Sequence, residues 1–340
     1  LCAAHDLVVA ADGVNSRVRA HFDAAFKPEI DRRACKFVWL GTQQKFDDAF
    51  TFIFEDTQHG WVWAHAYQFD GDTATFIVEC SEDTYNAWGF DSMSQDENIA
   101  ACEAIFADHL GGHSLMSNAR HLRGSAWLNF NRVLCENWYH KNVVLLGDSS
   151  ATAHFSIGSG TKLALESAIA LADLLHSEAR LEDAFSRYQE DRRLDVLRLQ
   201  SAARNSTEWF EDVERYLHLD PVQLNYSLLT RSQRISHENL RMRDAEWLKS
   251  AEMWFQQQAG ANGVTPPAGH RRQGSSGAPP AAVARAARRL ERRRKAEPRR
   301  VAVDRRHRCC AASPTARVRV VARPRVLLRG LAARRRVRLV

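Results

Sequence analysis

Residues 142–175, NVVLLGDSSATAHFSIGSGTKLALESAIALADLL, carry the pattern that decides the fold. The four consecutive apolar residues Val143 to Leu146 are typical of a short buried strand, and Gly147-Asp148 follow directly at its end. Small and hydroxyl residues then lead to Gly158-Ser159-Gly160 and to Lys162–His176, a helix with apolar residues on almost every side, which we expect to be buried on most faces. Because a helix N-terminus collects free N–H groups and positive dipole, this unit predicts a site for an electron-rich ligand. A plain βα crossover explains the same pattern.

A second stretch, residues 6–19 (DLVVAADGVNSRVR), repeats the arrangement of apolar strand and acidic turn. Its strand, Leu7 to Ala11, ends in Asp12-Gly13, and Arg17 and Arg19 follow shortly after. The two arginines could supply positive charge to phosphate groups, although a solvated helix face is an equal explanation for Arg19.

Both stretches resemble the two downstream fingerprints of the class A flavoprotein aromatic hydroxylases, which share the p-hydroxybenzoate hydroxylase fold. Asp12-Gly13 matches the first fingerprint and Gly147-Asp148 the second, without a gap through to the helix. The segment HFSIGSGTKLALE (154–166) and the texture of residues 25–255 further resemble the monooxygenase half of bifunctional salicylyl-CoA 5-hydroxylase and 2-aminobenzoyl-CoA monooxygenase. Indole-ring hydroxylases of violacein-type pathways have a similar HFSIG segment.

The resemblance implies cofactor contacts for particular residues. In the family, the aspartate at position Asp148, after Gly147, holds the ribityl chain of FAD, and the backbone of Gly158, Ser159 and Gly160 lies against the flavin ring. The family's aspartate at Asp12, with Gly13, is linked to the FAD pyrophosphate and to NAD(P)H binding, and Arg17 is a candidate phosphate contact. We therefore expect the carboxylates of Asp12 and Asp148 to flank one isoalloxazine. A turn or helix-capping role for Asp148 is the structural alternative.

The chain also departs from the common family pattern. His154-Phe155 stands near the position of the usual Pro-Pro, so His154 is a candidate catalytic residue beside the flavin's reactive edge, with a purely structural role as the alternative. Lys162 replaces the usual asparagine. The GxGxxG unit that cradles the ADP part of FAD is absent, so we expect a fragment that binds FAD weakly or not at all without that upstream unit.

The predicted fold class is α/β (α+β), an incomplete FAD-binding fold of this family. Residues 1–24 and 120–180 form the predicted FAD-binding domain, 25–119 a substrate-binding β-sheet domain, 181–256 a helical segment and 257–340 a tail. Residues 22–34 are expected to be a surface connection. The runs KFVWLGT, FTFIFED, GWVWAHAYQF and TATFIVEC predict strands, the last three an antiparallel meander. Their aromatic residues are more often core filling than substrate contacts.

Helices are expected at two further places. Ser94 to Leu110 has a capping residue, early acidic residues and helical apolar spacing, and Gly111-Gly112 ends it. Leu181 to about His218 is long, charged and helical, Pro221 breaks it, and residues 222–256 predict one or two short helices.

Charge divides the chain unevenly. Residues 257–340 hold 22 Arg and 1 Lys against 3 acidic residues, a balance of +20, whereas residues 1–256 carry a balance of −14. The tail lacks Phe, Tyr, Trp, Ile and Met, a composition that a GC-rich gene read out of frame would give. The rival interpretation is a disordered basic arm for nucleic acid or anionic lipid.

The sequence does not indicate a metalloprotein, a membrane protein, a specific nucleic-acid-binding protein or a flavin halogenase. The seven cysteines include no CxxC pair and no metal-ligand spacing, so we expect free thiols and no metal. There is no apolar run long enough for a membrane span, and a cytoplasmic protein without specific nucleic-acid binding is expected. The pair Trp61 and Trp63 suggests the W-x-W-x-I-P motif of flavin halogenases, but His65 and Ala66 stand at its last two positions.

The resemblance implies an aromatic hydroxylase that uses FAD, NAD(P)H and O₂ and acts through a flavin hydroperoxide. The expected substrate is a small aromatic aryl-CoA such as salicylyl-CoA or 2-aminobenzoyl-CoA. Arginines available for its phosphates are Arg120, Arg123, Arg231 and Arg234. The alternatives are an indole-type flavin hydroxylase and a noncatalytic, basic-tailed binding protein on a degenerate flavin fold. The oligomeric state stays open.

Overall fold

The computed structural model describes residues 5–46, 49–117, 127–261 and 317–323. Contacts divide the chain into two units, Leu1–Ala251 with Ala316–Val340, and Glu252–Thr315. The described part of the second unit is residues 252–261, the end of helix α10 (Ala245–Ala261). The features below belong to the first unit.

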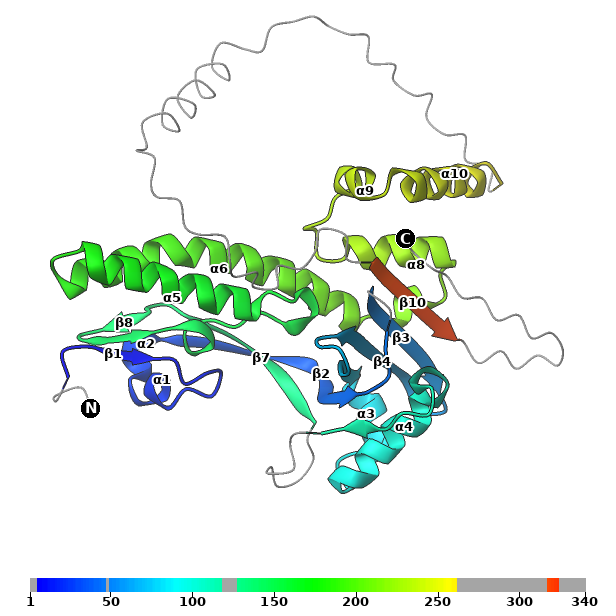
Figure 1. Cartoon of the computed structure of the whole chain (residues 1–340), viewed down its shortest axis with the longest axis horizontal. Coiled ribbons are helices and arrows are strands. Elements are labelled where there is room, and N and C mark those ends of the chain that lie inside the picture. Colours follow the sequence, from blue (N-terminus) through cyan, green and yellow to red (C-terminus); the bar gives the residue numbers. More distant parts are fainter. Residues whose placement is uncertain (1–4, 47–48, 118–126, 262–316, 324–340) are drawn as a thin grey trace, which may run out of the picture. The chain divides into compact units, whose positions relative to one another are not determined.

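A small sheet carries the two acidic turns. Strand β1 (Val8–Ala10) pairs in parallel with β9 (Val143–Leu145), and β9 pairs antiparallel with β8 (Tyr139–His140). Helices α5 (Gly160–Ser177) and α6 (Leu181–Glu211) run side by side over this region in Figure 1. The apolar strand residues, helix α5 and helix α6 share one core, which includes Val143, Val144, Leu145, Leu163, Leu171, Phe185 and Tyr188.

The predicted meander is confirmed in a larger sheet. Strands β3 (Ala49–Thr57), β4 (Gly60–Gln68) and β5 (Ala74–Cys80) pair antiparallel in sequence order, and β5 continues to β2 (Pro28–Thr42). The short strand β6 (Leu115–Met116) pairs with the end of β2. One face packs on the apolar residues of α3 (Glu82–Trp88) and α4 (Gln95–Leu110). The other face packs on the end of α6 and on α8 (Pro221–Thr230).

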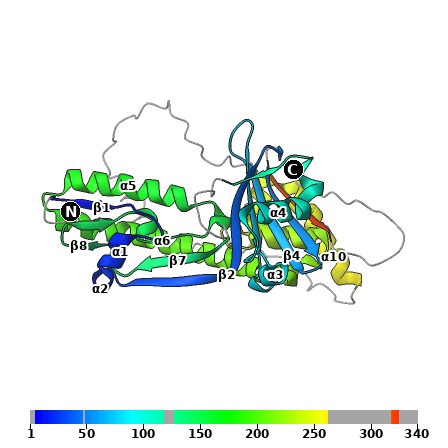
Figure 2. The same ribbon diagram turned by 90° about the horizontal axis from the view of Figure 1, so that it is seen from below.

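The prediction of a surface connection over residues 22–34 is wrong. After the short helices α1 (Arg17–His21) and α2 (Asp23–Phe26), strand β2 begins at Pro28, and residues 28–32 pair with β7 (Leu128–Cys135) before residues 36–42 join the meander. Figure 2 shows this β2–β7 ribbon leading toward the meander. A two-stranded ribbon exposes much of both faces, so the first half of β2 shows no alternation of apolar and polar residues that a sequence could reveal.

Helix signals in the sequence are mostly accurate. Ser94 and Glu97 form a capping box at the start of α4, and Gly111 ends it in the left-handed conformation, as predicted. The long predicted helix ends at Glu211 and is followed by α7 (Glu214–Leu217). Pro221 is the first residue of α8, and α9 (His237–Arg243) and α10 follow.

Helix α5 differs from its prediction. Leu163, Leu171 and Leu174 are buried, but Leu165 and Ile169 are 59% and 63% exposed. Within the described residues, α5 therefore buries one face and leaves a second apolar face uncovered. The prediction of burial on most faces does not hold among the described residues, where α6, the turn at residues 147–149 and the core of the small sheet pack against one face of this helix.

Most of the predicted tail lies outside the described residues. Strand β10 (Arg317–Arg323), which the sequence analysis does not anticipate, pairs in parallel with β3. Among the described residues, Cys35, Cys80, Cys102 and Cys135 are free and buried, and no helix is apolar over a length that would cross a bilayer.

Candidate functional site

The structure brings the two acidic turns together. Since Ala10 pairs with Leu145, the turns that follow both strands lie at the same edge of the small sheet. Backbone N–H of Leu146 donates to the carbonyl of Ala10 at 2.9 Å, and Ser149 Oγ donates to the same carbonyl at 2.6 Å. The carboxyl edge of parallel strands is where α/β proteins usually bind cofactors.

Arg19 connects the two acidic turns through hydrogen bonds to their backbone carbonyls. Its guanidinium donates to the carbonyl of Ser149 at 2.9 Å and to the carbonyl of Val14, and the side chain is 5% exposed. The solvated face predicted as one alternative for Arg19 is wrong, because the guanidinium is buried and hydrogen-bonded inside the fold. The phosphate contact stays a prediction. Backbone carbonyls, one five residues away and one 130 residues away, leave no signal in the residue pattern.

Asp12 orders its own helix. Its carboxylate accepts hydrogen bonds from Ser16 Oγ (2.5 Å) and from the backbone N–H groups of Arg17 (2.8 Å) and Val18 (3.2 Å). Partial burial opposes ionisation, but these hydrogen bonds lower the pKa of Asp12 below its ordinary value. Gly13 follows with φ of 81° in open space, and the side chain of Arg17 is exposed. The turn therefore presents a firmly ionised carboxylate beside the second turn.

Asp148 is differently placed. It belongs to the short 3₁₀ turn η1 (Gly147–Ser149), and its carboxylate has no hydrogen-bond partner among the described residues. The residue as a whole is exposed, but the protein around the carboxylate removes part of its hydration, and this partial desolvation raises the pKa of Asp148 above its ordinary value. Asp148 lines a crevice with a free volume of about 10 Å³, together with Gly147, Ser150, Ala151, Ala153, Gly160, Leu163, Ala164, Ser167 and Val196. This carboxylate can accept hydrogen bonds from a ligand.

Close packing fixes Gly147 against α5. Its φ is 66°, and a Cβ added there would lie 3.2 Å from Cβ of Ala164. A glycine is required on both counts, because the left-handed conformation and the contact each disfavour a side chain. The turn carrying Asp148 is thereby held near the start of α5.

The start of α5 forms an open ledge. Gly158, with φ of 59°, closes the 3₁₀ turn η2 (Phe155–Ile157), and nothing lies within 4 Å of the position where its Cβ would be. Ser159 precedes α5 but makes no side-chain cap; its Oγ donates to the carbonyl of Ile157 and accepts from Arg234 at 3.2 Å. The first N–H groups of α5 therefore lack a side-chain partner, and the dipole favours negative charge there.

These features fit FAD. The ribityl hydroxyls are hydrogen-bond donors that suit the unpartnered carboxylate of Asp148. The backbone at Gly158 has no atom within 4 Å of the place of a Cβ, and the α5 N-terminus suits electron-rich pyrimidine oxygens. The structure thus brings Gly147, Asp148 and Gly160 to one crevice, with Gly158 and Ser159 at the same helix start and Asp12 at the neighbouring strand end.

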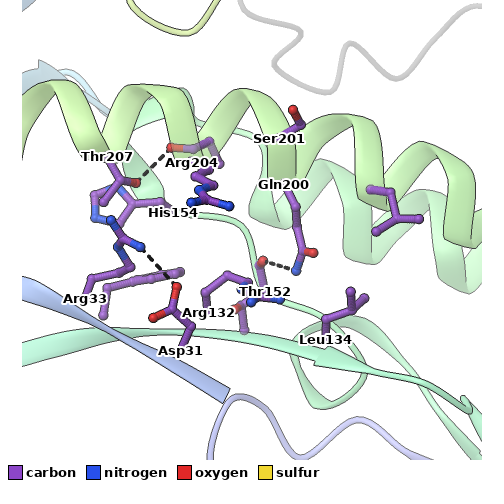
Figure 3. Close-up of a pocket in the computed structure, with 13 residues that line it drawn as sticks. Asp31, Arg33, Arg132, Leu134, Thr152, His154, Gln200, Ser201, Arg204 and Thr207 are labelled. Carbon is purple, nitrogen blue, oxygen red and sulfur yellow. Dashed lines mark hydrogen bonds and ion pairs between the residues drawn. The ribbon is translucent and has the colours of Figure 1, made fainter. Parts of the chain in front are cut away.

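His154 lies elsewhere, in a larger cavity of about 260 Å³ between the β2–β7 ribbon and α6 (Figure 3). Asp31, Arg33 and Arg132 line it from the ribbon and Gln200, Arg204 and Thr207 from α6. The imidazole is 4% exposed, and backbone N–H of Ser156 donates to its Nδ1 at 3.2 Å. Nδ1 is therefore an acceptor and Nε2 carries the proton. Burial lowers the pKa of His154 to about 4, so the ring is neutral at pH 7.

Two of the four arginines considered for a CoA moiety have structural partners. Arg231 donates to Ser206 Oγ (2.9 Å) and to the carbonyls of Leu228 and Ser156, and burial lowers its pKa to about 10. Its availability to phosphates is thus contradicted, because the guanidinium is enclosed. Arg234 is exposed but contacts Ser159. Arg120 and Arg123 lie outside the described residues.

The meander also holds a buried polar group that the sequence pattern does not predict. His65 and Glu79 are 0% and 1% exposed and lie 3.0 Å apart, Nε2 to Oε2. A lone carboxylate in the apolar run TATFIVEC, and a histidine two residues after Trp63, were the available signals. Both positions fall within predicted strands whose other residues are apolar or aromatic, and this composition conceals them.

A free carboxylate, a bare glycine ledge and an uncapped helix at the carboxyl edge of parallel strands define a protein of the cofactor-binding α/β class. The model of the FAD binding domain family matches residues 4–202, more than half of the chain, and the chain belongs to this family. The resemblance drawn from the sequence and the predicted fold class are both confirmed.

Curated relatives agree with this placement. The chain is 37% identical over 273 residues to salicyloyl-CoA 5-hydroxylase of a Streptomyces species, an alignment that covers 77% of this chain and 51% of the relative. Identity is also 37% to protodeoxyviolaceinate monooxygenase of Chromobacterium violaceum (65% and 58% covered) and to 3-hydroxy-4-methyl-anthranilyl-(aryl-carrier protein) 5-monooxygenase of Streptosporangium sibiricum (69% and 61%). The chain spans between half and two thirds of the length of these relatives.

Proposed function

We propose that this protein is an FAD-dependent monooxygenase that hydroxylates an aromatic ring bearing an ortho hydroxyl or amino group, carried as an aryl-CoA thioester such as salicylyl-CoA or 2-aminobenzoyl-CoA. The observation that carries the proposal is the pairing of the unpartnered Asp148 carboxylate with the open ledge at Gly158, in a chain of the FAD binding domain family. The names of two relatives, a salicyloyl-CoA and an anthranilyl-carrier hydroxylase, support the substrate class.

Bound FAD would supply the redox chemistry, taking two electrons from NAD(P)H and passing one oxygen atom of O₂ to the ring. The balance is ArH + O₂ + NAD(P)H + H⁺ giving ArOH + H₂O + NAD(P)⁺. An ortho hydroxyl or amino group makes the ring electron-rich, so the attack needs no dedicated protein base.

The chain's own residues would bind FAD and orient the substrate. Asp148 would accept hydrogen bonds from the ribityl hydroxyls, the backbone at Gly158 would adjoin the ring, and the start of α5 would stabilise negative charge on the reduced cofactor. Phe155, between these groups and the meander, contacts the rings of Phe37 (4.9 Å) and Trp39 (5.9 Å). These rings give a planar substrate an aromatic surface to pack against.

The test is turnover by the FAD-loaded protein. With salicylyl-CoA or 2-aminobenzoyl-CoA, we expect oxidation of NADH or NADPH to accelerate and a product heavier by one oxygen atom to appear in mass spectrometry. Benzoyl-CoA, which lacks the ortho donor, is the matched control and should give little product. Consumption of NAD(P)H that yields only hydrogen peroxide with every aryl-CoA offered would contradict the proposal.

An indole-type hydroxylase is the second candidate, because the violaceinate-pathway relative is as similar in identity as the aryl-CoA relative. Product formation from an indole compound, with none from the aryl-CoA substrates, would favour it.

A further inference from the structure

Trp63, His65 and Glu79 form a buried polar group within an aromatic face of the meander. Oε2 of Glu79 accepts a hydrogen bond from Trp63 Nε1 at 2.8 Å and lies 3.0 Å from His65 Nε2. All three side chains are almost completely buried. Buried polar groups need partners, so an ordered group of this kind inside an apolar core calls for a reason.

Strand register explains how the group forms. Trp63 of β4 pairs with Glu79 of β5, and His65, two residues along, lies on the same face and is the diagonal neighbour of Glu79. Phe52 of β3 lies opposite His65. The alternating residues Val62, Ala64 and Ala66 belong to the opposite face, where they pack on α4.

One polar atom of the group has no partner. Nδ1 of His65 is buried and makes no hydrogen bond within the described part of the chain. Aromatic rings surround the imidazole, those of Phe210 (4.7 Å between centroids), Phe52 (5.1 Å), Phe155 (5.5 Å) and Phe50 (6.5 Å). An apolar, aromatic lining with one unsatisfied polar atom is the usual composition of a site for a planar aromatic ligand.

The charges decide what this atom can do. Burial opposes the ionisation of Glu79, but the hydrogen bonds from His65 and Trp63 keep the pKa of Glu79 below its ordinary value. Burial lowers the pKa of His65, and the nearby charge of Arg231 acts in the same direction. An ionised Glu79 accepts the proton of Nε2, so a neutral His65 presents Nδ1 as a hydrogen-bond acceptor.

The position relates this atom to the candidate flavin site. Phe155, which contacts His65, belongs to the segment between the Asp148 turn and the start of α5. Phe155 is only partly buried, whereas Phe52 and Phe210 are fully buried. A ligand ring would reach Nδ1 by displacing the ring of Phe155, entering from the flavin side of the meander.

We propose that His65 Nδ1 accepts a hydrogen bond from the ortho hydroxyl or amino group of the substrate ring, and that Glu79 is a positioning residue that fixes the imidazole through Nε2. This inference rests on the proposed function and names the atom that recognises the substrate. When His65 accepts that hydrogen bond, the ring gains electron density. The oxygen transfer needs an electron-rich ring, so this contact favours it. Because of this one hydrogen bond, the protein should bind rings that carry an ortho hydroxyl or amino group more tightly than rings that lack one.

Two variants separate the roles of the two nitrogens. In His65→Gln the amide nitrogen reaches the place of Nε2 and keeps a donor for Glu79, but the acceptor at Nδ1 is lost. In His65→Asn the shorter amide keeps an acceptor at the place of Nδ1 and loses the donor to Glu79. Binding of 2-aminobenzoyl-CoA and benzoyl-CoA to the FAD-loaded protein is followed by quenching of tryptophan fluorescence.

For wild type we expect 2-aminobenzoyl-CoA to bind about tenfold more tightly than benzoyl-CoA, the ratio typical of one good hydrogen bond. His65→Gln should bring the ratio close to one, and His65→Asn should keep most of it. Equal discrimination in wild type and His65→Gln would overturn the inference while the hydroxylase assignment stands. Failure of wild type to bind either aryl-CoA would overturn both.

A second measurement uses wild-type protein and tests the proposal even if His65→Gln does not fold. In wild-type protein with ¹⁵N-labelled histidine, we expect the Nδ1 resonance of His65 to report an unprotonated nitrogen and to shift when 2-aminobenzoyl-CoA is added, but not when benzoyl-CoA is added. An Nδ1 resonance that ignores both ligands would contradict the proposal.

Discussion

His154 is a buried imidazole, and its ionisation ties stability to pH. Burial lowers its pKa in the folded protein to about 4, against about 6.5 in the unfolded chain. Between these values the unfolded chain binds the proton and the folded protein does not, so stability falls as the pH falls through this window.

We therefore expect the free energy of unfolding to drop by about 2 kcal/mol between pH 7 and pH 5 through His154 alone. In His154→Phe this part of the drop should disappear, as measured by urea unfolding at both pH values. An unchanged pH dependence in the variant would show that the imidazole is not held neutral by burial.

Arg19 offers a second prediction for a single residue. Arg19→Leu removes the guanidinium donors from the carbonyls of Val14 and Ser149, the second of which keeps only the weak Cys135 Sγ donor at 3.8 Å. The substitution should lower the free energy of unfolding by about 2 kcal/mol. Arg17→Leu, two residues away and exposed, is the matched control and should change it by less than about 0.5 kcal/mol. Equal losses in urea unfolding would contradict the role given to Arg19.

The sequence predicts the place of a residue well when that residue directly follows a strand, because the end of the strand fixes its position in the sheet. Asp12 and Asp148 each follow a short apolar run, and the structure places their turns at one sheet edge; their binding roles stay predictions. His65 and Glu79 went unnoticed because diagonal pairing across strands depends on register, which the sequence does not state. Apart from the hydroxyl of Ser206, which contacts Arg231, the partners of Arg19 and Arg231 are backbone carbonyls, which any residue supplies.

At the scale of elements, the packing of the η1 turn on α5 is directly testable. Gly147→Ala introduces strain at a φ of 66° and a contact of 3.2 Å with Ala164, and should cost about 3 kcal/mol of unfolding free energy. Gly158→Ala has a similar φ of 59° but open space around it, and should cost about 1 kcal/mol. Thermal unfolding of both variants measures the difference, and equal losses would argue against close packing of turn and helix.

Elements were predictable where local signals suffice. The capping box of α4 and the alternating strands of the meander are local, and both are confirmed. The start of β2 was missed because its stability comes from hydrogen bonding to β7, about a hundred residues away. The exposed face of α5 was missed because apolar residues show that a face can be buried but not what covers it.

For the whole molecule, fold class and family followed from two short stretches that the FAD binding domain match encloses. Charge composition separated an acidic body from a basic tail, and most of that tail lies outside the described residues, so its interpretation as an out-of-frame segment stays a prediction. The division into domains likewise stays a prediction.

The most direct test of the account is the affinity for FAD of the protein joined to the GxGxxG unit of a family member, measured by titration with flavin fluorescence. Asp148→Ala removes the unpartnered carboxylate and should weaken FAD binding at least about tenfold. Asp191→Ala, which removes an exposed carboxylate on α6, is the control and should leave the affinity unchanged. If Asp148→Ala binds FAD as tightly as wild type, the crevice beside α5 is not the flavin site and the central claim is wrong.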